Sequence, residues 1–202
     1  LLCLSSTLVF AQNKKEKKRS MFSYSVNLSD YSFFKSAKGA SFGKAFKQKG
    51  FFRPGSSSFG IGVSYWKGLT SNIDLSGNLG GTFSNFPASF VKDDSVGQAG
   101  FSTSLDALLH FRAFKEKAKI NPFLTGGIGA GYFANQLAVY VPIGTGLQFQ
   151  FKGGGFVFVQ TQWRMALTSG ITKDYMFYSI GFAQHGKLSK KEKKQKRKKG
   201  WL

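Results

Sequence analysis

Apolar and small polar residues alternate with a period of two along most of this chain. In FVFVQTQWRMALT, residues 156–168, the valines, tryptophan, methionine and leucine share one parity, while two glutamines and an arginine fall on the other. Successive side chains of a β-strand point to opposite faces of the sheet, so the pattern predicts strands rather than helices. Eight runs show it, at approximately residues 21–31, 57–66, 72–84, 98–113, 121–134, 136–151, 156–168 and 174–185.

The composition of the two faces indicates which one lies inside. One face of each run carries large apolar side chains, and the other is rich in Gly, Ser, Thr, Asn and Gln with isolated charged residues. A water-exposed face normally carries many Lys and Glu residues, and an uncharged apolar face of this extent would be sticky in water. We therefore expect the apolar face to contact lipid and the polar face to line a lumen. The predicted fold is all-β: an eight-stranded antiparallel up-and-down transmembrane β-barrel over residues 21–185.

The lengths of the connections support this topology. Long segments at residues 32–56 and 85–97 alternate with short ones, as external loops alternate with periplasmic turns in outer-membrane barrels. An even strand number then puts both long loops outside and both termini in the periplasm. Aromatic residues near the expected strand ends suit the girdles found at membrane interfaces. They are Phe22, Tyr65, Trp66, Phe83, Phe111, Tyr132, Phe151 and Tyr175.

One long uncharged stretch raises the alternative of a transmembrane helix. No charged residue occurs from Ile120 to Phe151, and more than about 18 apolar residues in a row would suggest a helical span. The stretch nevertheless contains six glycines, two prolines and several amide side chains, which favour two strands joined near Asn135. Pro142 removes a ladder hydrogen bond in a sheet that has no free edge, so we expect a β-bulge there.

The ends of the chain differ from the barrel region. Residues 1–11, LLCLSSTLVFA, are interpreted as the remainder of a secretory signal peptide cleaved after Ala11; a buried strand or helix is the alternative. Cys3 is the only cysteine, so residues beyond this stretch offer no thiol for a disulfide or a thiolate metal site. His110 and His185 give no metal-ligand spacing, and we expect no metal and no other cofactor.

The net charge of +20 is concentrated in three segments. Residues 12–20 form a basic N-terminal segment, residues 186–202 form a basic tail expected to be disordered, and one expected loop carries six bases. The loop either binds lipopolysaccharide phosphates or another acidic surface, or is simply a solvated cationic loop. Its basic residues are Lys35, Lys38, Lys44, Lys47, Lys49 and Arg53.

Three segments, VSYWKGLTSNIDLSGNLGGTF, VYVPIGTGLQFQF and FVFVQTQWRMALTSGITKDYMFYSIGFA, carry a resemblance to a known family. They resemble the small outer-membrane β-barrels of Gram-negative bacteria, particularly the Bacteroidota type of OmpA- or OmpX-like barrel. The ending YMFYSIGF is similar to the final-strand signal read by the barrel-insertion machinery, which the resemblance implies as a partner during assembly. In this chain a Lys-rich tail follows that signal, and no recognisable peptidoglycan-binding domain is present.

An eight-stranded barrel has an interior just wide enough for side chains to fill it, so a general diffusion pore is not expected. The leading hypothesis is a non-enzymatic outer-membrane protein with a surface-interaction role. Its partners would be membrane lipid, lipopolysaccharide through the loop, and peptidoglycan or another acidic polymer through the tail, without nucleic acid. The alternatives are a soluble, secreted or nucleic-acid-binding basic β-barrel and, more remotely, a lipid A-modifying enzyme, for which His110 lacks a Ser in a known signature.

Polar residues of the expected inner face are candidates for a lumen network. If the strands at 72–84 and 98–113 pair, four charged or titratable residues would lie near one another, and an Asp74–Arg112 contact would close the lumen. The alternative is that these are scattered polar residues without a defined network. The candidate residues are Asp74, Asp106, His110, Arg112, Gln160, Gln162 and Arg164.

Overall fold

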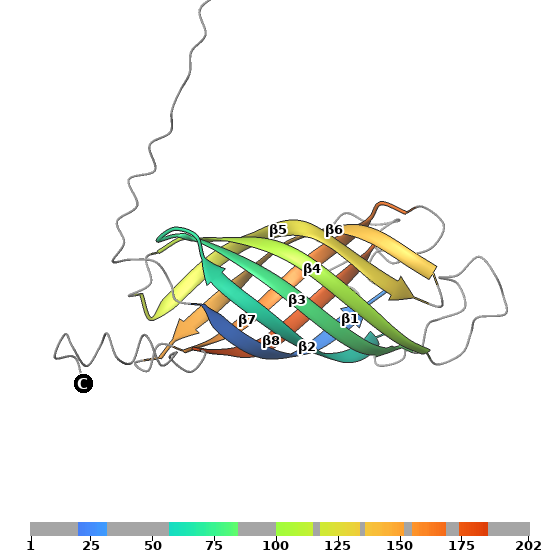
Figure 1. Cartoon of the computed structure of the whole chain (residues 1–202), viewed down its shortest axis with the longest axis horizontal. Coiled ribbons are helices and arrows are strands. Elements are labelled where there is room, and N and C mark those ends of the chain that lie inside the picture. The colour runs from blue at the N-terminus through green and yellow to red at the C-terminus, as the bar shows by residue number, and fades with distance from the viewer. Residues whose placement is uncertain are drawn as a thin grey trace, which may run out of the picture.

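The computed structural model describes residues 20–31, 57–84, 100–114, 118–133, 136–151, 155–168 and 174–185, and nearly all of them lie in eight strands (Figure 1). Each strand boundary lies within two residues of its predicted position. The strands are β1 (Met21–Asp30), β2 (Ser57–Gly68), β3 (Ile73–Ser84), β4 (Gly100–Arg112), β5 (Ile120–Phe133), β6 (Gln136–Gln150), β7 (Phe156–Ala166) and β8 (Tyr175–His185). Within these ranges no helix is long and apolar enough to cross a membrane.

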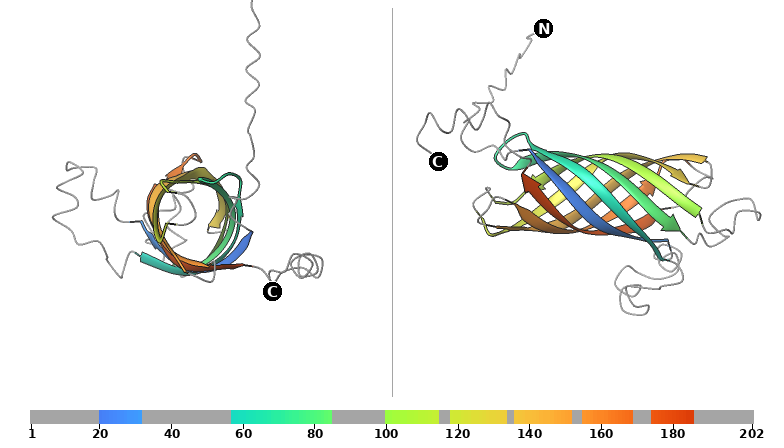
Figure 2. Two further views of the ribbon diagram at one scale, coloured as in Figure 1. Left: turned by 90° about the vertical axis from the view of Figure 1, so that its left-hand side faces the viewer. Right: turned by 60° about the horizontal axis from the view of Figure 1, so that its bottom comes forward.

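The sheet closes on itself, which confirms the predicted eight-stranded antiparallel barrel. Each strand pairs with its neighbours in sequence, and β1 pairs with β8 from Met21 beside His185 to Asp30 beside Met176. The left panel of Figure 2 shows the resulting ring of strands. Closure pairs the backbone groups of every strand on both sides, so the wall presents no open edge. We call the end where β1 begins the terminus end and the opposite end the loop end.

The register fixes how strongly the strands are tilted. Paired residues can be followed once around the barrel, from Lys67 of β2 through β3 to β8, and the last of them lies beside Asp30 of β1. The direct β1–β2 register instead places residue 20 beside Lys67. One circuit of the barrel therefore shifts the register by ten residues along β1. Such a stagger is what tilts the strands of a closed barrel by about 35–45°. The tilt decides which inward side chains from different strands meet at one height.

Side chains sort by parity as the alternation predicts. Large apolar residues point outward on every strand, and Leu105, Ile61 and Leu124 are each more than 60% exposed. Among the outward positions of the described strands, only Asp30 and Lys67 are charged, and each lies at or next to the end of its strand. The charged residues Asp74, Asp106, Arg112 and Arg164 all point inward and are buried. The wall therefore has an uncharged outer belt and a polar interior.

Two residues expected in the outer aromatic girdles lie inside instead. Trp66 and Tyr175 are each 1% exposed, because they share parity with the inward serines of their strands. The other six are outward, and Phe22 packs on Tyr65 near the terminus end with ring centroids 5.2 Å apart. Each aromatic ring that turns inward closes part of the lumen.

The expected β-bulge at Pro142 is wrong. The β5–β6 pairing stops after Gly126–Ile143 and resumes at Gly129–Tyr140 in the same register, so neither strand contains an extra residue. On its other side Pro142 stays in step with Arg164 of β7. The missing donor is therefore accommodated by a short gap in one ladder.

Two glycines of β5 allow the strands around the lumen to pack closely. A Cβ at Gly127 would fall on the backbone carbonyl of Ala107, and a Cβ at Gly129 would fall on the Asp106 carboxylate and the Tyr140 ring. Gly129 thus leaves the space in which these two side chains meet.

Candidate functional site

The inward side chains form two dense clusters separated by a polar cavity. The loop-end cluster comprises Tyr31, Ala138, Tyr140, Tyr175 and Phe177 with the Asp106–Arg164 pair, and the terminus-end cluster comprises Met21, Trp66, Phe156, Phe158 and Ala183. The loop-end cluster joins β4 and β8, which lie opposite each other in the ring, whereas the terminus-end cluster comes from the consecutive strands β7, β8, β1 and β2.

Arg164 of β7 is the centre of the loop-end cluster. Its Nη2 lies 2.7 Å from Asp106 Oδ2, its Nη1 donates to the hydroxyls of Tyr140 and Tyr175 at 3.2 Å, and its Nε donates to Gln162 Oε1 at 3.3 Å. Tyr140 in turn donates to Asp106 Oδ1 at 2.6 Å. Every nitrogen of the guanidinium and both carboxylate oxygens are therefore engaged, which is what a buried ion pair requires.

Aromatic rings surround this ion pair. The Arg164 guanidinium carbon lies 3.6 Å from the centre of the Phe177 ring and 5.0 Å from that of Tyr140. Tyr31 packs on Tyr175 with ring centroids 4.9 Å apart, on the loop side of the pair. The cation–π contacts add to the ion pair, and the rings cover part of its surface.

A second ion pair lies near the terminus end. Arg112 Nε is 3.0 Å from Asp74 Oδ2, and Nη2 donates to Asp74 Oδ1 at 3.3 Å and to the carbonyl of Ser71 at 2.8 Å. Both side chains are fully buried. Since Ser71 belongs to the β2–β3 turn, Arg112 ties that turn to β4.

His110 links the second ion pair to the terminus-end cluster. It lies opposite Asp74 in the β3–β4 register, its Nε2 is 2.8 Å from Ser76 Oγ, and its ring stacks on Trp66 with centroids 4.1 Å apart. The indole Nε1 of Trp66 donates to Ser23 Oγ at 3.0 Å. The stack spans the interior from β1 to β4.

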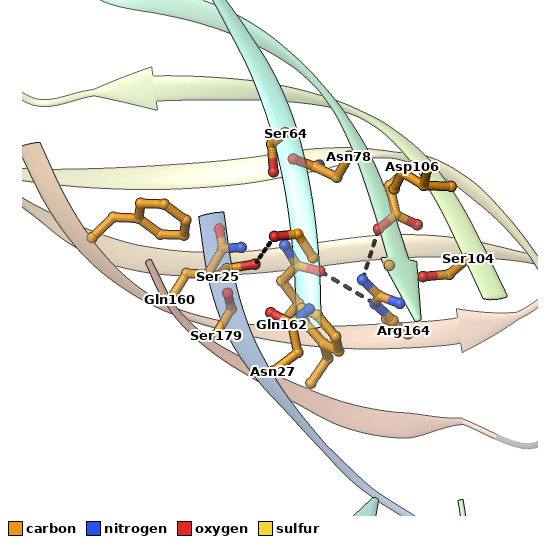
Figure 3. A pocket seen from close by; sticks show the side chains of 15 residues that line it. Ser25, Asn27, Ser64, Asn78, Ser104, Asp106, Gln160, Gln162, Arg164 and Ser179 are labelled. Atoms are coloured by element: carbon orange, nitrogen blue, oxygen red, sulfur yellow. Dashed lines mark hydrogen bonds and ion pairs between the residues drawn. The ribbon is translucent and has the colours of Figure 1, made fainter. Parts of the chain in front are cut away.

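A polar cavity of about 20 Å³ lies between the two clusters (Figure 3). Figure 3 shows Asp106 and Arg164 facing each other at one side, with polar side chains of β1, β2, β3, β4, β7 and β8 around the remaining space. They are Ser25, Asn27, Ser64, Asn78, Ser104, Gln160, Gln162 and Ser179.

The structure divides the seven candidate residues of the lumen between these groups. Asp74, His110 and Arg112 lie together near the terminus end, whereas Asp106 joins Arg164 and Gln162 farther along the barrel. Asp106 is thus not part of the group in which the sequence placed it. Gln160 lines the cavity.

Several residues of these clusters escaped prediction. Tyr140 and Phe177 were missed, and Trp66 and Tyr175 were assigned outward. All four share parity with the polar residues of their own strands, which is the signal that identifies them. The six bases of the loop, Lys35 to Arg53, lie outside the described residues.

In the described ranges no group of three or more His, Cys, Asp and Glu residues could hold a metal ion.

Comparisons with known proteins add the following. No protein-family model matches the chain, and no curated protein matches it. The N-terminal β-barrel domain of OprF from Pseudomonas aeruginosa aligns with a TM-score of 0.51 and 18% identity over 84% of this chain and 100% of that domain. Neisserial surface protein A aligns with a TM-score of 0.54 and 8% identity over 83% of this chain and 96% of its own. At these identities the likeness establishes the fold, that of a bacterial outer-membrane barrel.

Proposed function

We propose, from the outer-membrane barrel fold that this chain shares, that it is a non-enzymatic protein of a bacterial outer membrane with a closed lumen. Its strands would cross the membrane, its long loops would face outward, and both termini would lie in the periplasm. Its role would be structural and adhesive, because it presents a basic loop at the cell surface.

The uncharged outer belt is the observation that carries this proposal. Apart from Asp30 and Lys67, which lie at or next to strand ends, no described outward strand residue is charged, and the side chains are mostly Leu, Ile, Val and Phe. The charged groups instead lie on the inner face in paired contacts. A barrel dissolved in water requires the reverse arrangement, with apolar side chains inside and charges outside.

The two inner clusters support a lumen that does not conduct solutes. Each combines an ion pair or hydrogen-bonded groups with stacked rings from several strands, and the cavity between them measures only about 20 Å³. That volume is about the size of a single water probe sphere or slightly more. A solute of the size of a sugar or an amino acid has no passage without displacement of a cluster.

The basic loop is the proposed contact with acidic surfaces. Residues 35–53 belong to the connection between Asp30 of β1 and Ser57 of β2, which leaves the barrel at the loop end. Six bases in this connection favour phosphate-bearing lipopolysaccharide or another acidic polymer. The attraction would weaken with salt, because exposed charges are screened beyond about 8 Å at physiological ionic strength.

The Ser76–His110 contact does not favour catalysis. A serine within hydrogen-bond reach of histidine is one requirement of a nucleophile. Here, however, Ser76 is 1% exposed and His110 is fully buried beneath Trp66, inside the barrel wall. Lipid on the outer surface cannot reach this pair, so we assign it a structural role in the closure of the lumen.

Fractionation of a Gram-negative host that expresses the full chain tests the proposal. We expect the protein in detergent extracts of the outer membrane and a change in gel mobility when samples are heated, because a closed barrel resists unfolding in detergent. Recovery in the soluble fraction, with equal mobility before and after heating, would contradict the proposal.

A second experiment tests the loop. Replacement of Lys44, Lys47 and Lys49 by Gln should weaken binding to lipopolysaccharide vesicles at low salt and leave the heat-dependent gel shift unchanged. A matched variant with three tail lysines, Lys190, Lys191 and Lys193, changed to Gln should bind as the unmodified chain does. Binding that is equally strong for all three proteins at low and high salt would count against the loop.

A further inference from the structure

Three amide side chains around the central cavity are buried without a full set of hydrogen bonds. Asn27 of β1 is 5% exposed, and Gln160 and Gln162 of β7 are 8% and 1% exposed. Asn27 Oδ1, Gln160 Oε1 and Gln162 Nε2 have no hydrogen-bond partner among the described residues. All three side chains line the same cavity (Figure 3).

Unpaired polar atoms at such depth are costly, since burial removes their hydrogen bonds to water. Buried amide groups in folded proteins are therefore almost always paired, either with protein or with ordered water. The same cost does not arise in the neighbouring Asp106–Arg164 pair, whose atoms are engaged with each other and with Tyr140. A ligand of the cavity must therefore satisfy the amides and not the charges.

The set of unpaired atoms defines the chemistry of that ligand. Two atoms, on Asn27 and Gln160, are acceptors and need a donor, whereas the one on Gln162 is a donor and needs an acceptor. A bare cation would serve only the acceptors and an anion only the donor. Asp106 and Arg164, the charged residues that line the cavity, neutralise each other, so neither ion gains from an uncompensated charge. The ligand must both donate and accept hydrogen bonds even if the O and N atoms of any of these amides are exchanged, because each carboxamide carries both a donor and an acceptor.

The volume of the cavity sets the size of the ligand. It measures about 20 Å³, and a cavity needs about 10–15 Å³ in the same measure to hold one water molecule. We propose that the cavity is a binding site for one or two ordered water molecules that bridge Asn27 of β1 to Gln160 and Gln162 of β7. The site goes beyond the closed lumen proposed above, because it places bound water among the polar side chains between the two clusters.

This arrangement gives the lumen three layers. The two aromatic clusters are filled by side chains, and the layer of Asn27, Gln160 and Gln162 between them holds the bound water. The bridge joins two strands that are not neighbours in the sheet, since β8 lies between β7 and β1. Loss of the water therefore weakens a contact across the lumen that no backbone ladder supplies.

Nuclear magnetic resonance of the isotope-labelled, refolded full chain in detergent micelles tests the site directly. We expect rotating-frame cross-peaks between bulk-exchanging water and the side-chain amide protons of Asn27, Gln160 and Gln162, with the sign of bound water rather than of chemical exchange. Asn121 is the internal control: it is fully buried, and its amide donates to and accepts from the backbone of Phe114 at 2.7 and 3.0 Å. Cross-peaks absent from all three cavity amides, or equally strong at Asn121, would overturn the proposal.

The stability of the Q160L variant is an independent test, because a cavity that holds water and an empty cavity predict opposite changes in its urea midpoint. Leucine retains the bulk but not the hydrogen bonds. If water bridges the amides, the variant loses the Asn27 cross-peak and unfolds at lower urea concentration. If the cavity is dry, the same change removes an unpaired polar atom, and the urea midpoint stays unchanged or rises. Since the cross-peaks of the unmodified chain are measured separately, the proposal is tested even if Q160L does not fold.

Discussion

Arg164→Ala should be among the most destabilising single substitutions in the lumen. The change leaves Asp106 buried, with Tyr140 still donating to one oxygen and nothing paired with the oxygen that lay 2.7 Å from Arg164. Breaking a buried ion pair by removal of one partner costs about 3–5 kcal/mol. Because every 1.4 kcal/mol is tenfold, the folding equilibrium should fall by roughly two to four powers of ten.

The matched control is a variant that removes both charges and keeps their bulk. Asp106→Leu combined with Arg164→Met leaves no buried charge in the loop-end cluster, and such replacements are often neutral or stabilising. Reversible urea unfolding in lipid vesicles, followed by tryptophan fluorescence, should rank the double variant well above Arg164→Ala. A loss of less than about 1 kcal/mol in Arg164→Ala, or a double variant less stable than the single one, would show that Arg164 does not stabilise a buried Asp106 charge.

Three further perturbations have definite expected results. Arg112→Ala should lower thermal stability and raise ion leak through planar bilayers, because it removes the inner ion pair at the terminus end; no change in either would argue against a closing role. Leu105→Lys, in the middle of the outer belt, should lower the free energy of unfolding in lipid by about 2–4 kcal/mol, whereas Leu137→Lys near a strand end should lower it by about 0–1 kcal/mol. Equal urea midpoints for the two variants would contradict a lipid-facing belt. Gly127→Ala should destabilise by about 1–3 kcal/mol, since its Cβ would meet a backbone carbonyl, whereas Gly77→Ala, which has open space, should lose little; the two urea midpoints decide.

The strands and their inner faces were predictable because one rule repeats in every strand. A period of two leaves only two choices of inward face, and eight strands with the same small polar parity make the same choice. The misplaced Trp66 and Tyr175 show what happens when residue type is given more weight than parity. Both are aromatic residues near strand ends, as in a girdle, but parity places them inside.

The partners of the lumen residues were not predictable because they depend on register and tilt. In the β3–β4 pairing Asp74 lies opposite His110 and Asp106 opposite Asn78. Four residues along a strand separate these positions by about 13 Å, so one compact group of charges could not form. The partner of Asp106 is Arg164 of β7, a strand that does not pair with β4. The two side chains lie at the same height in the barrel because the register shifts by ten residues over one circuit of the strands.

The two tryptophans of the barrel wall provide the most direct test of which face is outside. Trp163 is outward and 41% exposed, whereas Trp66 is inward and 1% exposed. In one variant Trp66 and Trp201 are changed to Phe, and in the other Trp163 and Trp201 are changed, so that each protein keeps a single tryptophan of the wall. In vesicles of lipids with brominated acyl chains, we expect strong quenching of Trp163 fluorescence and little quenching of Trp66 fluorescence. Equal quenching of both, or stronger quenching of Trp66, would contradict a barrel that faces lipid with its apolar belt.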